Sequence, residues 1–543
     1  MGKMVAVIPA CAGGSGLPNK NIRLIKNRPL IYYVIQTARQ CAYISDIVVT
    51  TNSDVIISIA NQMGVRVRKR KAELCSRDVS LEAVIYDALA AFSDIDFDYV
   101  VTLQSISPTL RVETLNAAIE EYLHSDCDSM VSVVNKPFFF WFGNKEQPRP
   151  LYSERINRHL LPPFYQEVGA FQITRKACVT PESRWGMKTR LYELTDMESM
   201  DVNTFGDLKQ VESILMKKRV AFYVNGNHSI GLGHIYRVLE LADEFDSKPD
   251  IYYDIRKTDP AVFGVSPHKI IPVDGEEQLI RYLKEKQYHI FISDILSTTE
   301  MYMMAVRQAL PQAMLINFED DGPGARMADA VINALYEKSE LSNVYTGVPY
   351  FIASKLFLMY EPISIAERVR HVLVTFGGAD PNHYTEMMLS LAGLPEFSDL
   401  QFIFVIGRAK SNAAQLLSMQ RARNIDMVFD TQNMAELMSR TDIAVTSRGR
   451  TGYELTLMGV PALSLAQNAR EEMHTFLRRE NGIIFLGRQP AEENVLSTFR
   501  HFARSSREER LAIQRQLLAH DLRHGREHVL CLIQNYFDGR SNS

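Results

Sequence analysis

The sequence predicts an α/β protein made of Rossmann-like units, and two observations lead to this prediction. Short apolar stretches rich in β-branched residues alternate with amphipathic helical stretches, which is typical of strands joined by crossover helices. The alternation begins afresh at residues 219–226 and again at 371–382, where an apolar strand runs into a glycine-containing turn. We therefore expect one domain over residues 1–218 and a second, two-lobed domain over residues 219–543.

The first domain is expected to contain a doubly wound sheet. Its predicted elements, in order, are strand 4–8, helix 30–40, strand 46–51, helix 55–63, strand 65–67, helix 81–92 and strand 99–104. Strands separated by helices of this length indicate parallel βαβ units. An amphipathic helix closes the domain within residues 201–218, and the two lobes of the second domain are expected at about 219–368 and 369–543.

The composition describes an ordinary globular chain and argues against several classes of protein. The chain has 543 residues, of which 46% are hydrophobic and 23% charged, and its net charge of −4 gives no reason to expect a nucleic-acid partner. No apolar run approaches about 18 residues, so no membrane span is expected. The N-terminus shows no apolar signal core, and the six cysteines are scattered without C-x-x-C pairing. A reducing cytoplasm is the simplest setting for such a chain.

A loop of small residues follows the first strand, in the stretch MVAVIPACAGGSGLPNKN at residues 4–21. A loop with almost no side chains lets backbone N–H groups approach an anion closely, and Lys20 can add a point charge to phosphate oxygens. The spacing fits neither the dinucleotide fingerprint G-x-G-x-x-G nor the P-loop G-x-x-x-x-G-K-[ST]. We therefore expect a phosphate-binding loop of a different kind.

This loop resembles the signature loop of the acylneuraminate (CMP-sialate) cytidylyltransferases. Further stretches are similar to that family in the same order: 48–65, RKAELCSRDVS at 70–80, VTLQSISPTLR at 101–111, VGAFQI at 168–173 and DVNTFGDL at 201–208. The resemblance covers about residues 3–218 and implies a GT-A-like nucleotidyltransferase domain. The implied reaction joins CTP to a nonulosonic acid, a nine-carbon α-keto sugar acid, and releases pyrophosphate.

The resemblance also implies roles for individual residues. The nucleotide-binding residues would be Gly13, Gly14, Ser15, Gly16, Asn21, Arg70, Asp78 and Ser80, with Lys20 and Asp201 catalytic. The residues facing the sugar acid would be Gln104, Ser107 and Arg111, and the position of a Mg²⁺ cofactor would be set by Asp201 and Asn203.

Three departures from the family pattern affect the phosphate and metal sites. Cys11 and Ser15 stand where the family has an arginine and a lysine, and Asn203 stands where it has a second aspartate. Thr109 is one extra residue in the loop of 101–111. The loss of two cations should weaken the binding of a triphosphate, so the first domain serves a variant substrate or has reduced activity.

The second domain carries its own glycine turn between a strand and a helix, with the pattern Gly231-x-Gly233-His234-x-x-Arg237. A histidine in such a turn can act as a general base near neutral pH or donate to phosphate. The motif resembles the loop of the UDP-sugar hydrolase of pseudaminic acid biosynthesis, a relative of the GT-B glycosyltransferases. Further similar stretches lie at 292–296, 316–334, 374–382 and 447–468.

By this resemblance the substrate would be a UDP-amino sugar, with His234 and Asp294 as the catalytic residues. Residues on the nucleotide would be Gly231, Gly233, Arg237, Gly377, Gly378, Gly449, Thr451, Gly452 and Glu454, and the sugar contact would be Asn468. Glu454 would accept both ribose hydroxyls, because a carboxylate has the acceptor geometry for a vicinal diol.

Together the two resemblances imply a bifunctional enzyme of bacterial nonulosonic acid biosynthesis, of the pseudaminic, legionaminic or sialic type. Three other interpretations stay open. The second domain could be a GT-B glycosyltransferase, the first domain could only bind its ligands, or the first domain could activate another acid such as a Kdo-type sugar. Whether UDP is released without an acceptor tests the first interpretation. CTP-dependent pyrophosphate release tests the second.

An aromatic cluster in the first domain predicts a homodimer. Residues 136–165 contain Phe138, Phe139, Phe140, Trp141 and Phe142 in a stretch with poor helix or strand periodicity. Five adjacent aromatic residues cannot all point into the core of one monomer, and related synthetases use this region as an arm that crosses onto a partner. The alternative is a buried internal strand.

Overall fold

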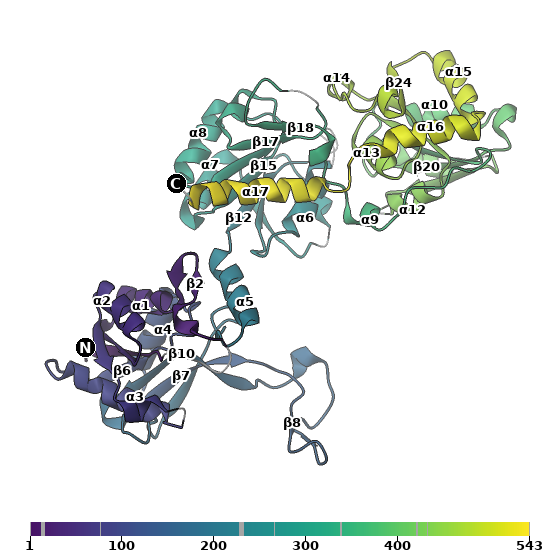
Figure 1. The fold of residues 1–543 in the computed structure, drawn as a ribbon. Helices are drawn as coiled ribbons and strands as arrows, with labels where there is room; N and C mark the ends of the chain where they lie inside the picture. The colour runs from purple at the N-terminus through teal and green to yellow at the C-terminus, as the bar shows by residue number, and fades with distance from the viewer. Residues whose placement is uncertain are drawn as a thin grey trace. The chain divides into compact units, whose positions relative to one another are not determined.

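The computed structural model describes residues 2–11, 17–76, 78–226, 233–264, 266–336, 339–419, 422–431 and 433–541. The chain forms two compact units, Met1–Lys217 and Lys218–Ser543 (Figure 1). None of the described helices is both long and apolar enough to cross a membrane.

The first unit is built on a seven-stranded sheet with the order β11-β7-β10-β6-β1-β4-β5. Its strands are β1 (Met4–Pro9), β4 (Ile44–Thr51), β5 (Arg66–Lys69), β6 (Tyr99–Thr102), β7 (Ser129–Asn135), β10 (Tyr165–Arg175) and β11 (Thr189–Glu193). Its helices are α1 (Leu30–Gln40), α2 (Asp54–Gln62), α3 (Leu81–Ala88), α4 (Val112–Leu123) and α5 (Phe205–Met216). Two short hairpins complete it, β2 (Leu24–Ile25) with β3 (Arg28–Pro29), and β8 (Trp141–Phe142) with β9 (Arg149–Pro150).

The sheet has a parallel part, which the sequence predicts, and one antiparallel strand, which it does not. The strands expected from the sequence, β1, β4, β5 and β6, pair in parallel. Strand β10 is antiparallel to both β6 and β7, so the sheet is mixed. The carboxyl ends of the parallel strands therefore share one edge with the amino-terminal half of β10, which is where ligands of such sheets bind.

Both faces of the sheet are buried because alternate residues of β1 pack in opposite directions. Ala6 and Ile8 belong to the core beneath α1, which contains Ile35, whereas Val5 and Val7 belong to a second core on the other face. A strand covered on both faces needs a continuous apolar run, and this is the pattern of residues 4–8.

The second unit contains two parallel sheets. The first lobe has the strand order β14-β13-β12-β15-β16-β17-β18 and the second lobe has β21-β20-β19-β22-β23-β24. The strands of the first lobe are β12 (Val220–Val224), β13 (Asp250–Asp254), β14 (Lys269–Val273), β15 (Ile290–Asp294), β16 (Met314–Phe318), β17 (Ala330–Asn333) and β18 (Val344–Thr346). Those of the second lobe are β19 (His371–Thr375), β20 (Gln401–Ile406), β21 (Ile425–Phe429), β22 (Ile443–Ser447), β23 (Ala462–Ala466) and β24 (Ile483–Arg488).

Helices cover both sheets of this unit. In the first lobe they are α6 (Gly233–Ala242), α7 (Glu276–Lys286) and α8 (Glu300–Ala309), and α9 (Lys355–Leu358) follows before the second lobe. In the second lobe they are α10 (Tyr384–Ala392), α11 (Ala413–Ser418), α12 (Met434–Ser439), α13 (Arg450–Leu457), α14 (Ala469–Glu472), α15 (Glu492–Ala503) and α16 (Arg507–Leu518). The predicted fold class, an α/β chain with a Rossmann-like first domain followed by a two-lobed second domain, is confirmed.

The last helix, α17 (Gly525–Ser541), returns to the first lobe, as the yellow helix beside β12 and α6 shows in Figure 1. Val529 and Ile533 join the core that contains Phe222, and Arg526 pairs with Glu240 on α6 at 2.6 Å. The stretch expected as the second lobe, residues 369–543, therefore ends with a helix that packs on the first.

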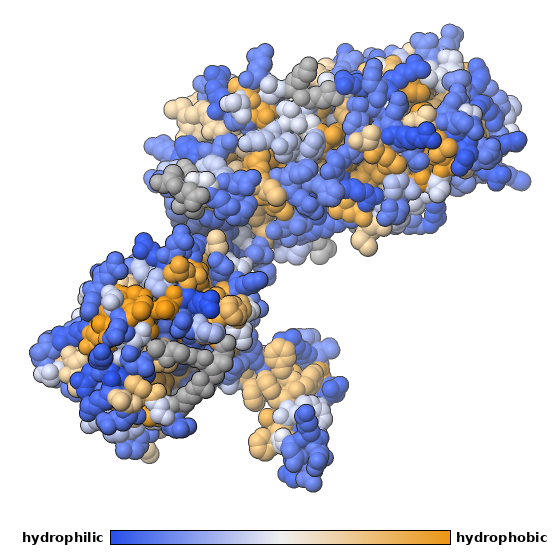
Figure 2. All heavy atoms as spheres, viewed as in Figure 1, coloured by the Kyte–Doolittle hydropathy of each residue, from blue (hydrophilic) through white to orange (hydrophobic). Residues whose placement is uncertain are grey.

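The aromatic cluster of the first unit lies on an arm that carries the β8–β9 hairpin (Figure 1). Trp141 is 54% exposed and Phe142 is 69% exposed, and apolar side chains are visible along the arm in Figure 2. The ring of Phe140 stacks on Phe164 at 4.2 Å. The alternative of a buried internal strand is therefore wrong, and dimerisation through the arm stays a prediction.

Candidate active sites

Asn21 connects two loops at the carboxyl edge of the first sheet. Its Nδ2 donates to the main-chain O of Cys11 at 2.8 Å, and its Oδ1 accepts from Ser105 Oγ at 2.7 Å. The side chain expected to hold nucleotide oxygens thus fastens the end of the phosphate loop to the loop after β6. The predicted phosphate-binding residues Gly13, Gly14, Ser15 and Gly16 lie outside the described residues.

The structure brings the predicted catalytic and metal residues of this unit together. Lys20 Nζ donates to Asn203 Oδ1 at 3.3 Å. Asp201 Oδ1 accepts from Ser107 Oγ at 2.5 Å, and its Oδ2 accepts from the backbone N–H of Gly169 at 3.1 Å. Ser107, expected to face the sugar acid, therefore orients the carboxylate.

Asp201 is the predicted magnesium ligand of this unit, and a magnesium ion at this position stays a prediction. Among the residues that the structure describes, no group of three or more His, Cys, Asp or Glu side chains could hold a metal ion. Mg²⁺ usually needs only one or two carboxylates, because phosphate oxygens and water fill its other positions. One carboxylate from Asp201, beside the amide of Asn203, meets that requirement.

The residues expected to face the sugar acid differ in their contacts. Gln104 lies against Gly169, where an added Cβ would come within 2.8 Å of its Cδ, so this glycine makes room for the amide. Arg111 instead pairs with Glu198, with nitrogen–oxygen distances of 3.1 and 3.3 Å. Burial alone would raise the pKa of Glu198, but hydrogen bonds from Arg111 and two threonine hydroxyls lower it. The guanidinium of Arg111 is therefore already paired with a protein carboxylate, that of Glu198.

The remaining predicted nucleotide residues of this unit follow β4 and β5. Arg70 Nη2 donates to the main-chain O of Thr50 at 3.0 Å, and burial lowers the pKa of its guanidinium. Ser80 caps α3 by accepting from the N–H of Ala83 at 3.3 Å. The backbone N–H of Asp78 is bonded within the same loop.

The second unit contains a buried charged network at the end of β15. His234 Nδ1 contacts Asp294 Oδ1. Arg237 donates from Nε to Asp294 Oδ2 and from Nη2 to Asp294 Oδ1, both at 2.7 Å, and its Nη1 pairs with Glu319. The structure therefore joins the predicted catalytic pair and Arg237 in one cluster, with the side chain of Asp294 fully buried.

Asp294, Glu319 and Arg237 are charged at neutral pH, and Asp294 orients the histidine. Burial would raise the pKa of Asp294, but Arg237 and His234 hold it far below its usual range. The same balance of burial against Arg237 lowers the pKa of Glu319 to about 2. An ionised Asp294 accepts the Nδ1 proton of His234, so the ring nitrogen Nε2 keeps its lone pair and can act as a base.

In the second lobe the turn that holds Gly377 and Gly378 follows β19. Gly377 has a φ of +75°, a conformation that favours glycine. A Cβ on Gly407 would come within 2.3 Å of the Gly377 carbonyl oxygen, so the loop after β20 approaches this turn closely. The N–H of Ala409 donates to the carbonyl of Gly378 at 3.0 Å.

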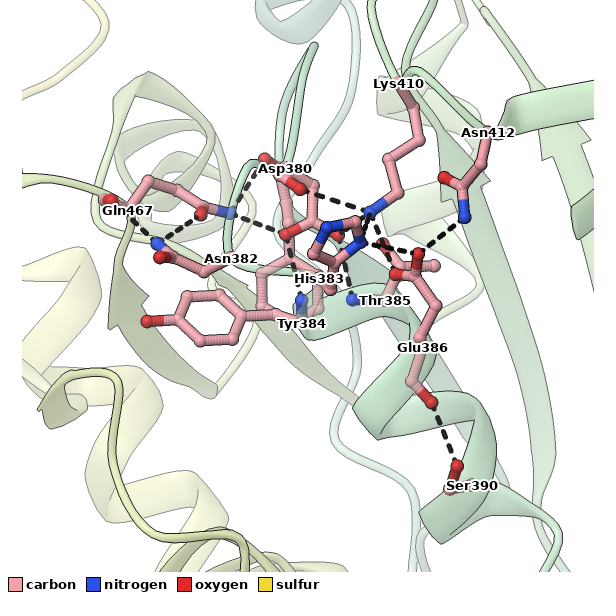
Figure 3. Close-up of polar contacts among 11 residues, drawn as sticks. Asp380, Asn382, His383, Tyr384, Thr385, Glu386, Ser390, Lys410, Asn412 and Gln467 are labelled. Atoms are coloured by element: carbon pink, nitrogen blue, oxygen red, sulfur yellow. Dashed lines mark hydrogen bonds and ion pairs between the residues drawn. The ribbon is translucent and has the colours of Figure 1, made fainter.

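A buried lysine fixes the far side of this turn (Figure 3). Lys410 Nζ donates to Asp380 Oδ2 at 2.9 Å, to the Asp380 main-chain O at 3.1 Å and to Glu386 Oε2 at 2.8 Å. Asp380 also accepts from the N–H groups of Tyr384 and Thr385, which open α10. The glycine turn is therefore held rigidly between β19 and α10.

The predicted residues of α13 have different surroundings. Gly449 precedes the helix and Thr451 is its second residue, partly exposed. Gly452 is buried against Leu477, where a Cβ would lie 2.4 Å from Leu477 Cδ1, so it serves helix packing. Burial raises the pKa of Glu454, and its role toward ribose hydroxyls stays a prediction.

The last two predicted positions are a helix cap and a helix start. Asn468 caps α14 by accepting from the N–H of Glu471 at 2.9 Å. Gly233 opens α6, and a Cβ there would come within 2.9 Å of Arg450 Cδ. Gly231 lies outside the described residues.

The sequence did not single out Glu319 or Lys410. Glu319 lies in the stretch 316–334 noted above, but nothing in its spacing marked it. Its φ of +49° is unusual for a residue other than glycine and is typical of functional sites.

The first unit has clear relatives. The family model described as cytidylyltransferase matches residues 5–225. The CMP-N,N'-diacetyllegionaminic acid synthase of Legionella pneumophila is 39% identical over 228 residues, which are 39% of this chain and 96% of that protein. Over this region the chain belongs to the cytidylyltransferase family.

Two further likenesses cover more of the chain. The spore coat polysaccharide biosynthesis protein SpsG of Bacillus subtilis is 25% identical over 261 residues, which are 46% of this chain and 77% of that protein. The solved structure of Acinetobacter baumannii MurG has 14% sequence identity and a TM-score of 0.44, and the match covers 59% of this chain and 99% of that one.

Proposed function

We propose that this chain is a bifunctional enzyme of nonulosonic acid biosynthesis. Its first unit would join CTP to a nonulosonic acid to give a CMP-sugar, and its second unit would hydrolyse a UDP-amino sugar. Membership of the cytidylyltransferase family supports the first activity. The buried pair of Asp294 and His234 is the observation that supports the second.

In the first reaction a sugar hydroxyl oxygen would attack the α-phosphorus of CTP. The bond to the pyrophosphate oxygen breaks, its electron pair leaves with pyrophosphate, and the hydroxyl proton passes to water. Such a transfer needs positioned charge more than covalent help. Lys20 supplies a cation beside Asn203, and Asp201 would hold Mg²⁺, which when bound neutralises charge on the phosphates.

In the second reaction a water oxygen would attack the anomeric carbon of the UDP-sugar. The bond from that carbon to the β-phosphate oxygen breaks, and its electron pair leaves with UDP. His234 Nε2 would take the proton of the water, and Asp294 would stabilise the resulting imidazolium.

Two measurements test the two activities. The first is pyrophosphate release from CTP with a panel of nonulosonic and Kdo-type acids. The second is UDP release from UDP-amino sugars without an acceptor. The variant His234→Ala should slow UDP release by about 10²–10⁴-fold and leave pyrophosphate release unchanged. A matched control is His268→Ala, because His268 also pairs with a carboxylate, Asp243 at 2.9 Å, on the same lobe. It should retain both activities.

The outcomes separate the alternatives. UDP release that requires an added acceptor would identify the second unit as a glycosyltransferase, since His234 could equally deprotonate an acceptor hydroxyl. No pyrophosphate with any acid, although CTP binds, would leave the first unit a binding module. UDP release that persists in His234→Ala would return this histidine to a structural role.

A further inference from the structure

Arg450 is a partly buried arginine with one buried guanidinium nitrogen, and the sequence did not single it out. It is the first residue of α13, and its Nη2 donates to the main-chain O of Ile352 at 2.6 Å. Its guanidinium lies over the ring of Phe351, 4.7 Å from the ring centre. Nη1 is buried and has no hydrogen-bond partner among the residues that the structure describes. A buried donor left without an acceptor costs free energy unless a ligand supplies one.

The side chain of Arg450 lies close to Gly233 of α6. Gly233 opens the ten-residue helix α6 of the first lobe, and its missing Cβ leaves the space that Arg450 Cδ occupies. Arg450 itself opens the eight-residue helix α13 of the second lobe. A helix N-terminus carries partial positive charge and unpaired N–H groups, so the start of α13 favours an anion at this place.

The electrostatic surroundings of Arg450 contain one further guanidinium and three carboxylates. Burial and the neighbouring guanidinium of Arg237 lower the pKa of Arg450, whereas the carboxylates of Glu319, Glu454 and Asp294 act in the opposite direction. Arg237 is already neutralised by the carboxylates of Asp294 and Glu319. Arg450 Nη1, which has no partner among the described residues, is therefore the donor available to an incoming anion.

We propose that Arg450 Nη1 binds the diphosphate of a UDP nucleotide at the junction of α6 and α13. This inference rests on the proposed UDP-sugar chemistry of the second unit. Two observations support this inference: Arg450 Nη1 has no partner among the described residues, and the side chain of Arg450 lies close to Gly233.

Arg450 is placed to help the leaving group as well as to bind it. When the bond between the anomeric carbon and the phosphate oxygen breaks, the electron pair stays on the β-phosphate. A fixed N–H donor becomes more stabilising as that charge grows, so it lowers the barrier as well as the dissociation constant. The Ile352 carbonyl holds the guanidinium in place before the ligand arrives.

The experiment measures the binding of UDP, UMP and uridine to the whole protein by calorimetry, and the rate of UDP release. Arg450→Gln should weaken UDP by about 10- to 100-fold, weaken UMP less and leave uridine unchanged. Arg450→Lys keeps the charge but loses the planar fork, so it should recover part of the loss. The control Arg500→Gln removes a cation of α15 that pairs with Glu396, and should change nothing.

A second variant distinguishes a local loss of binding from misfolding of Arg450→Gln. Gly233→Ala keeps Arg450 but adds a Cβ 2.9 Å from its Cδ, and should also weaken UDP more than uridine. Wild-type affinity for UDP in Arg450→Gln, or a wild-type protein that does not bind UDP, overturns the inference. If UDP binding depends on Arg450 but no UDP-sugar is hydrolysed, the site stands and the proposed hydrolysis fails.

Discussion

Replacing Asp294 by asparagine changes one atom in the buried network. It tests whether Asp294 keeps His234 in the form that can act as a base. Asp294 accepts from His234 and twice from Arg237, and its side chain has no exposed surface. An amide can offer only one acceptor oxygen, so its NH₂ group must face either His234 or Arg237. If the NH₂ group donates to His234 Nδ1, the histidine carries its proton on Nε2 and cannot act as a base.

The size of the effect follows from these contacts. Loss of general-base catalysis typically costs about 10²–10⁴-fold in rate. Arg237 would keep Glu319 but lose one ionised partner, and breaking a buried ion pair costs about 3–5 kcal/mol of stability. UDP release by Asp294→Asn should therefore fall at least 100-fold, together with a lower unfolding temperature of the second unit.

The assay follows UDP release from a UDP-amino sugar at a temperature at which circular dichroism shows the variant folded. The control is Asp254→Asn, because Asp254 is also buried at the end of a strand of the same sheet, β13, and contacts neither His234 nor Arg237 in the described bonds. It should retain the wild-type rate. A folded Asp294→Asn protein that releases UDP at the wild-type rate would refute the role given to the pair.

Three further predictions concern other parts of the chain. Cys11→Arg combined with Ser15→Lys should tighten CTP binding about tenfold or more per restored phosphate contact, measured by calorimetry, and unchanged affinity would mean that this loop does not meet the triphosphate. Glu319 has a pKa of about 2 in the fold against 4.5 ordinarily, so it stabilises the fold above pH 4.5, and this contribution of about 3 kcal/mol is lost as the pH falls toward 2. The variant Glu319→Gln should therefore lose less stability than wild type between pH 5 and pH 2 in urea unfolding, and parallel losses would contradict the assignment. Trp141→Ser with Phe142→Ser should convert a dimer to a monomer in light scattering, whereas a monomeric wild type would rule out the arm as an interface.

The sequence predicted the fold class because apolar runs and helical periodicity are local signals. Helix α1 spans Leu30–Gln40, as expected, since its apolar face repeats at helical spacing. The antiparallel direction of β10 was not predicted, because a buried apolar run is the same whichever way the strand runs. The return of α17 to the first lobe is a long-range contact that no local pattern encodes.

The candidate sites were predicted only where residues belong to a motif. His234 and Asp294 come from separate stretches, and their contact depends on the parallel pairing of β12 with β15. Arg450 and Glu319 had no such marker, because a single charged residue in a loop or first turn is usually solvated. What distinguishes them is burial, and burial follows from the packing of elements far apart in the chain.

The central claim is that one chain carries two independent nucleotide-sugar activities, and phosphorus NMR of a single reaction tests it most directly. The protein is given CTP, a nonulosonic acid and a UDP-amino sugar together, beside a parallel reaction with His234→Ala. We predict that wild type forms pyrophosphate, CMP-sugar and UDP, and that the variant forms pyrophosphate and CMP-sugar while UDP no longer accumulates. UDP formation unchanged in the variant, or wild-type protein that forms neither pyrophosphate nor UDP, would contradict the claim.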